Sequence, residues 1–229
     1  MDSCKTGILP VQTTFRRAPN EAGQSFVELS LVLIILALLF GGVLEFGFLM
    51  NNYLHVLDAA REGARFASSS NPFAEDGSND PTFYQNAAIT ALRAMEPVAL
   101  NGNLGDDIVI SVLGVDSTPT ITRYPDEDGW SLCDNHDYFA ADLAGYVSTW
   151  NESDWTDCIP RSSRFTTADF AARLEASAPN NGNVMVEIFY NYPQLLKLPI
   201  FNNDFFSAIP DPIPVYIYAA MPCSMAEPH

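Results

Sequence analysis

The chain has 229 residues, which is enough for one sizeable domain or two small ones. Apolar residues make up 48% of it and charged residues 17%, a composition that excludes disorder throughout. The formal net charge of −17 would repel a polyanion, so we expect no nucleic-acid partner. Three histidines and four cysteines leave little material for a His/Cys metal site.

An uncharged run of sixteen residues, Leu29–Leu44, lies between Glu28 and Glu45, and apolar side chains continue to Met50. At about 1.5 Å of rise per residue the run covers roughly 24 Å of helix. A bilayer core is about 30 Å thick, so a span needs the flanking residues and puts both glutamates near its edges. A buried globular helix is the alternative, which an apolar surface on all sides disfavours. We therefore expect a transmembrane helix over residues 24–50.

The distribution of charge predicts the orientation of this helix. Three basic residues precede it, Lys5, Arg16 and Arg17, whereas residues 70–229 carry six Lys and Arg against twenty-two Asp and Glu, a net −16. The positive-inside rule then keeps the N-terminus in the cytoplasm and exports the C-terminal part. We expect a single-pass membrane protein with an extracytoplasmic head.

The residues before the span differ from an ordinary secretory signal, which has a shorter apolar run and a small-x-small cleavage site. A basic leader, residues 1–23, ends at Gly23 and is followed by Gln24. Glycine has no side chain, so a peptidase can approach its backbone closely. Glu28 then lies at the cytoplasmic edge of the helix, where a carboxylate is costly unless a cation pairs with it. A new amino terminus on Gln24 of a neighbouring subunit would supply that cation.

The helix is expected to continue outside the membrane, so that residues 26–69 form one long helix. Four charged residues at i, i+3, i+4 and i+7 share one of its faces: Asp58, Arg61, Glu62 and Arg65. Beside them runs a stripe of small residues: Ala59, Ala60, Gly63, Ala64 and Ala67. Such a stripe lets another helix or a sheet approach closely. It is compatible both with packing inside the chain and with contact between subunits. Glu45 likewise either reaches interfacial water or has a packing or assembly role.

A basic leader, a glycine before the cleavage point, a glutamate five residues beyond it and an apolar helix together resemble a type IV prepilin. The run Gly23–Gly47 (GQSFVELSLVLIILALLFGGVLEFG), followed by Ala59–Ser68 (AAREGARFAS), is similar to the TadE-like family, the pseudopilins of tight-adherence pilus systems. The chain departs from the family pattern at Ser30, where alanine is usual, and in lacking a proline in the apolar run. The resemblance covers about residues 23–69 strongly and the remainder weakly.

This resemblance implies a role in pilus assembly, and through it in cell adhesion, biofilm formation and secretion. It implies cleavage after Gly23 and assembly roles for Glu28 and Glu45. It also implies helix packing through a second block: Ala60, Arg61, Glu62, Gly63, Ala64 and Arg65. The implied partners are other pseudopilins, the major pilin, the prepilin peptidase, the inner-membrane platform of the pilus machine and membrane lipid. The alternative is an uncleaved, single-pass, membrane-anchored extracellular binding module.

Residues 51–229 are expected to form an α+β head, with helices packed on a small antiparallel sheet of about four strands, as in pilins. Asp80 and Pro81 begin a helix that runs to Met95. Its inward face consists of Phe83, Ala87, Ala88, Ala91 and Leu92. A second helix is expected over 166–178, with Phe170, Leu174 and Ala178 on one side. The expected strands are 107–115, 118–124, 184–192, where Pro193 ends the strand, and 214–221.

An acidic, aromatic-rich insert over residues 125–164 interrupts the strand pattern, and it is the part that a binding module would use. Cys133 and Cys158 bracket its middle. Outside the cytoplasm the pair can form a disulfide, which would stabilise the fold by roughly 3 kcal/mol through loop closure. Two buried thiols are the alternative, and a bridge from either cysteine to Cys223 also remains open.

Two acidic loops, 126–129 and 76–80, offer oxygen ligands but lack the spacing of an EF-hand, so we expect a solvated acidic surface rather than a calcium site. The chain contains no G-x-S-x-G elbow, no H-E-x-x-H motif and no glycine-rich phosphate loop. His55, His136 and His229 are scattered along it. We therefore expect neither an enzyme nor a cofactor.

Overall fold

The structure is a computed structural model that describes residues 21–115, 121–172, 182–197, 210–223 and 225–226. The chain divides into two units, residues 1–42 and residues 43–229. The described part of the first unit is the beginning of helix α1. The second unit contains the rest of α1 and all the other elements, and it is the part that carries a packed core.

Helix α1 spans Glu21–Ser68, 48 residues, and confirms the single long helix expected from the sequence. Within the described chain, α1 is the one helix long and apolar enough to cross a membrane. In the part of α1 that belongs to the first unit, most of the large apolar side chains from Phe26 to Phe40 are exposed. A helix that is apolar on every side and not covered by protein suits lipid, because its backbone groups are already hydrogen-bonded internally.

Within the described residues of the second unit, five antiparallel strands form one sheet: β1 Asp107–Val115, β2 Ile121–Tyr124, β3 Trp130–Ser131, β4 Gly182–Tyr192 and β5 Ile213–Cys223. The order is β2-β1-β4-β5, and β3 also pairs with β1. The strands expected at 107–115, 184–192 and 214–221 are confirmed. Of the strand expected at 118–124, residues 118–120 lie outside the described residues. Strand β3 was not expected from the sequence. It has only two residues, too few to form a recognisable pattern.

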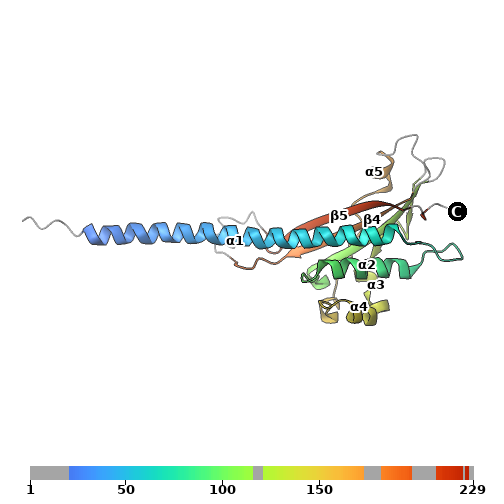
Figure 1. The fold of residues 1–229 in the computed structure, drawn as a ribbon, viewed down its shortest axis with the longest axis horizontal. Helices are drawn as coiled ribbons and strands as arrows, with labels where there is room; N and C mark the ends of the chain where they lie inside the picture. The colour runs from blue at the N-terminus through green and yellow to red at the C-terminus, as the bar shows by residue number, and fades with distance from the viewer. Residues whose placement is uncertain (1–20, 116–120, 173–181, 198–209, 224, 227–229) are drawn as a thin grey trace, which may run out of the picture. The chain divides into compact units, whose positions relative to one another are not determined.

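Different segments of the chain pack on the two faces of the sheet. Successive side chains of a strand point to opposite faces, so each face has its own set of contacts. Alternate residues of β1 and β4 join the main core with α1 and with α2, which spans Pro81–Met95. Figure 1 shows the C-terminal part of α1 lying along β4 and β5, with α2 beside it. On the other face, the Arg164 guanidinium lies 4.2 Å from the ring centre of Tyr216, and the ring centres of Phe165 and Tyr218 are 4.7 Å apart. The end of the insert and the residue that follows it therefore cover part of the second face.

Helix α2 begins and ends where the sequence predicted. The Asp80 carboxylate accepts a hydrogen bond from the Thr82 backbone N–H at 2.9 Å, and Pro81 occupies the first turn. The five residues expected to face inward are all buried. The second expected helix is observed as α5, Thr167–Ala171, which starts with a capping box between Thr166 and Asp169. Its expected continuation, with Leu174 and Ala178, lies outside the described residues.

The insert is folded rather than an interruption of the fold. It contains β3 and four short helical segments: α3 Leu132–Asn135, η2 His136–Phe139, α4 Ala140–Tyr146 and η3 Glu152–Asp154. A further short helix, η1 Gly102–Leu104, packs beside it, since Asn103 Nδ2 donates to the Ser153 carbonyl at 2.9 Å. Trp130 and Trp155 are buried in the main core. These two tryptophans therefore extend the hydrophobic core from α2 into the insert.

Gly63 lies where α1 packs closely against α2. A Cβ atom built there would lie 3.0 Å from the Ala91 Cβ and 3.4 Å from the Ala87 carbonyl oxygen. We predict that Gly63→Leu destabilises the head by about 1–3 kcal/mol, because the leucine forces the helices apart and this outweighs its better helix propensity. Urea unfolding of the full chain in detergent measures the effect. Gly145→Leu on α4 is the control, since nothing lies within 4 Å of its Cβ position; equal losses in both variants would contradict the packing described.

Candidate functional site

Glu45 is the first buried residue of α1 in the second unit, with 7% of its surface exposed. Its carboxylate accepts three hydrogen bonds. The Tyr192 hydroxyl and the Leu195 N–H both donate to Oε1 at 2.9 Å, and the Leu196 N–H donates to Oε2 at 2.8 Å. Hydrogen bonds to a charged group are each worth about 1.5–3 kcal/mol, so together they offset the cost of burying the carboxylate. We call these four residues the Glu45 clasp.

The chain after β4 is shaped to make this clasp. Pro193 has no N–H to continue the ladder, so the strand ends at Tyr192 and the chain turns. The next N–H groups then point back to α1. Gln194 fixes the turn from the other side, because its side-chain Nε2 donates to the Pro210 carbonyl at 3.2 Å and its backbone N–H to Asp211 Oδ1 at 3.3 Å. The loop is thereby held between α1 and the segment that leads into β5.

A second tyrosine of the same strand reinforces the clasp. Tyr190 projects to the same face as Tyr192, and its hydroxyl accepts a hydrogen bond from Asn52 Nδ2 at 3.1 Å. Glu45 and Asn52 are seven residues apart, two helical turns, and so share one face of α1. Between the tyrosines, Asn191 is held by the Asp106 carboxylate through its N–H at 2.7 Å and its side-chain amide at 3.0 Å. The end of β4 is thus bonded on both sides.

The protonation state of Tyr192 favours its hydrogen bond to Glu45. Burial, and then the hydrogen bond to the Glu45 carboxylate, raise the pKa of Tyr192 above its ordinary value. The phenol therefore keeps its proton and remains a donor at neutral pH. A phenolate facing a carboxylate would be repelled, so the clasp requires a protonated tyrosine.

The small-residue stripe of α1 is covered within the chain. Ala60, Gly63 and Ala64 are buried, against α2 and the sheet. Of the two interpretations of this stripe, packing inside the head is the one observed. The charged residues beside it remain outside: Arg65 Nε donates to Glu62 Oε2 at 2.8 Å, and Arg61 lies 3.7 Å from the Asp58 carboxylate.

The predicted processing and pairing residues lie on the other unit. Gly23 and Gln24 are in the first turns of α1, and Glu28 follows with an exposed side chain. They are not brought to the Glu45 clasp, which is built from the second unit alone. Sequence reasoning singled out Glu45 but not its partners.

Cys133 and Cys158 form a disulfide, and Cys223 is a buried free thiol. The bridge ties α3 to the end of the insert. The tryptophans of the insert are used internally, with Trp155 only 1% exposed and its ring stacked 5.1 Å from that of Trp150. Trp155 in particular is therefore not available to contact a ligand of a binding module.

The acidic loops use their carboxylates to close their own turns. Asp126 Oδ1 accepts the N–H groups of Asp128 and Gly129 at 3.0 and 2.9 Å, and Asp76 Oδ1 accepts that of Ser78 at 3.0 Å. No cluster of three or more His, Cys, Asp or Glu suited to a metal ion occurs in the part of the chain that the structure describes.

Three buried acids organise the head, and sequence reasoning missed them. Asp106 binds Asn191, as above, and Asp107 accepts hydrogen bonds from Ser131 Oγ at 2.7 Å and from the Arg161 N–H at 2.8 Å. Glu187 accepts the Tyr216 hydroxyl at 2.5 Å. The signal that could have found them is an acid inside, or directly before, a strand that is otherwise apolar.

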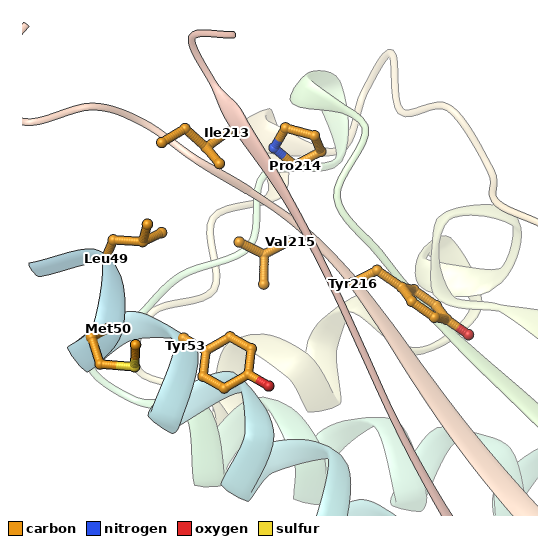
Figure 2. A pocket seen from close by; sticks show the side chains of 7 residues that line it. All are labelled: Leu49, Met50, Tyr53, Ile213, Pro214, Val215 and Tyr216. Atoms are coloured by element: carbon orange, nitrogen blue, oxygen red, sulfur yellow. The ribbon is translucent and has the colours of Figure 1, made fainter. Parts of the chain in front are cut away.

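A shallow apolar groove of about 300 Å³ lies between α1 and β5. Figure 2 shows Leu49, Met50 and Tyr53 of α1 across from Ile213 and Val215 of β5. The groove begins one helical turn beyond Glu45. It continues the apolar surface of α1 onto the head.

The buried acids make stability depend on pH. Burial raises the pKa of Asp106 to about 6 from an ordinary 3.8. The folded head therefore binds this proton more tightly than the unfolded chain does, so the contribution of Asp106 is fully present below about pH 4 and is lost as the pH rises through about 6. We predict that Asp106→Asn flattens the fall in unfolding free energy between these values, as measured by urea denaturation. Asp142→Asn, an exposed carboxylate on α4, is the control; the same flattening there would refute the assignment.

The part of the chain that matches a known family lies in α1. A family model described as TadE-like protein matches residues 23–65, which include Gly23, Glu28, Glu45 and the Ala59–Arg65 block. No curated protein and no solved structure matched the chain. The sheet, its covering helices and the long apolar helix together form the α+β arrangement of pilins. Residues 23–65 of this chain are a TadE-like family domain.

Proposed function

We propose that this protein is a TadE-like pseudopilin, or minor pilin, that acts in the assembly of a tight-adherence pilus. The observation that carries the proposal is the TadE-like domain over residues 23–65. It coincides with one helix whose beginning has exposed apolar side chains and whose later part, from Glu45, is packed on an α+β head. Proteins of this kind are structural components, so the proposal includes no enzymatic activity.

The N-terminus is proposed to lie in the cytoplasm and the head outside it. The excess of basic residues before the helix supports this orientation. The Cys133–Cys158 disulfide is consistent with it, because disulfides persist in oxidising compartments. The partners are then those of a pilus machine: other pseudopilins, the major pilin, a prepilin peptidase, the inner-membrane platform and membrane lipid.

Contact with other subunits is proposed to use two parts of α1. In the membrane, Glu28 pairs with the new amino terminus of a neighbouring Gln24, since a charge there is stabilised by an opposite charge. Outside it, the exposed face with Arg61, Glu62 and Arg65 is available, because Ala60, Gly63 and Ala64 are already covered by the head. The second contact would be polar and sensitive to salt.

Processing tests the proposal directly. We predict that the protein purified from its own membranes begins at Gln24, and that this start is lost when the prepilin peptidase is deleted. Gly23→Ala should retain residues 1–23, because a side chain at this position obstructs the peptidase. The N-terminal residue and the intact mass are the measurements. An intact leader in the native strain would argue against the pseudopilin route and in favour of an uncleaved anchored module.

Glu28 has a separate test. We predict that Glu28→Ala is processed normally but assembles poorly, because the amino terminus of the neighbour loses its carboxylate partner. The readouts are the mass of the mature chain and its recovery in sheared pilus or co-purified complex fractions. Glu75→Ala, an exposed acid of the head, is the matched control. Normal assembly of the Glu28 variant would contradict the hypothesis that Glu28 pairs with the amino terminus of a neighbouring Gln24.

A further inference from the structure

The loop that closes the Glu45 clasp exposes two leucines. Leu195 is 59% exposed and Leu196 is 40% exposed, although their N–H groups are fixed on the buried carboxylate. We infer that residues 193–197 are a second membrane contact of this protein, which enters the interfacial layer of the bilayer beside α1. The inference rests on the proposed membrane span of α1 and adds a lipid-binding surface on the head.

The depth of Glu45 supports this assignment. A helix needs about 20 residues to cross a hydrocarbon core of about 30 Å. Counted from Leu29, the first residue after Glu28, that length ends near Phe48. Glu45 is then about 4–5 Å inside the boundary, at 1.5 Å per residue. Because the Leu195 and Leu196 N–H groups lie 2.9 and 2.8 Å from its carboxylate, the loop is held at the same level.

The hydrogen bonds of the clasp suit a position just inside the hydrocarbon boundary. A carboxylate inside the boundary lacks water, and so do the N–H groups of a loop beside it. Here each satisfies the other, and the Tyr192 hydroxyl supplies the third donor. The side chains of Leu195 and Leu196 can then face lipid without leaving their backbone N–H groups unpaired.

The part of α1 next to Glu45 also exposes apolar side chains. Phe46, Phe48 and Met50 of α1 are exposed large apolar side chains next to Glu45 in the sequence. The groove of Figure 2 extends the same surface to Ile213 at the start of β5. Exposed apolar patches that continue a membrane helix are typical of contact with the bilayer.

The charge of the loop differs from that of the rest of the head. Residues 70–229 have a net charge of −16, which disfavours approach to anionic lipid. Residues 193–197 contain no acid and end at Lys197, one of the two lysines of the chain, with an exposed side chain. A lysine beside apolar residues can bury its stem and leave its ammonium group among lipid phosphates.

The test uses the full chain in vesicles of phosphatidylethanolamine and phosphatidylglycerol. The background carries Cys4→Ser and Cys223→Ala and keeps the disulfide. A polarity-sensitive fluorophore is attached at Leu196→Cys, at Leu36→Cys in the apolar helix, or at Ser69→Cys just beyond the end of α1, about 36 Å from Glu45 along the axis. Quenching is measured with lipids that carry a doxyl group either near the headgroup or near the acyl-chain end.

We expect the label at position 196 to be blue-shifted and quenched most by the doxyl group near the headgroup. The label at position 36 should be quenched most by the deeper group, and that at position 69 by neither. If position 36 is quenched and position 196 behaves like position 69, the loop contact is refuted while the span stands. If position 36 is not quenched, the span itself fails. A blue-shifted but unquenched label at position 196 would mean that protein, not lipid, covers the loop, and would also overturn the inference.

Glu45→Ala provides a second readout in the same assay. Without the carboxylate the loop loses its attachment to α1, so quenching at position 196 should fall toward the level at position 69. Glu62→Ala is the matched control, an acid of the same helix whose side chain bonds Arg65. Unchanged quenching in the Glu45 variant would show that the clasp does not set the depth of the loop.

Discussion

The rest of the structure depends on one face of α1. This face needs polar side chains where it meets the end of β4, and small side chains where it meets α2. Glu45 and Asn52 bond the two tyrosines at the end of β4, and one turn later Val56 enters the core. Beyond it, alanines and Gly63 let α2 come into contact with the helix. Since these positions recur every three or four residues, one straight helix meets both requirements. The head is therefore built on α1 rather than attached to it through a linker.

α1 therefore has two parts: before Glu45 its apolar side chains are exposed, and from Glu45 onward the helix contributes to a packed protein core. A carboxylate at the transition would be destabilising alone, and the turn after β4 makes it favourable by supplying three donors. The clasp also links the strand that forms most of the sheet pairing to the helix that would carry the subunit in a pilus.

Local signals made much of the fold predictable. The apolar run predicted α1, Asp80 and Pro81 set the start of α2, and strongly apolar segments marked β1 and β4. Features that depend on distant residues were not predictable. Glu45 could be recognised as unusual, but its partners lie about 150 residues away. Asp106, Asp107 and Glu187 lie inside or directly before apolar strands, but in so acidic a chain this position alone does not identify their partners. The insert's tryptophans looked available for a ligand, although the core uses them. Burial, not residue type, decides their role.

A double-mutant cycle between Glu45 and Tyr192 tests most directly whether the helix is fastened to the head by the clasp. The cycle compares the unfolding free energies of the native chain, Glu45→Gln, Tyr192→Phe and the double variant, all as the full chain in the same detergent. Both substitutions nearly keep the size of the side chain: Glu45→Gln replaces one charged oxygen acceptor with an NH2 group, and Tyr192→Phe removes the hydroxyl donor. The account predicts a coupling energy of about 0.5–3 kcal/mol, as for residues in direct contact. Losses that add to within about 0.3 kcal/mol would mean that the two residues act independently, and would contradict it.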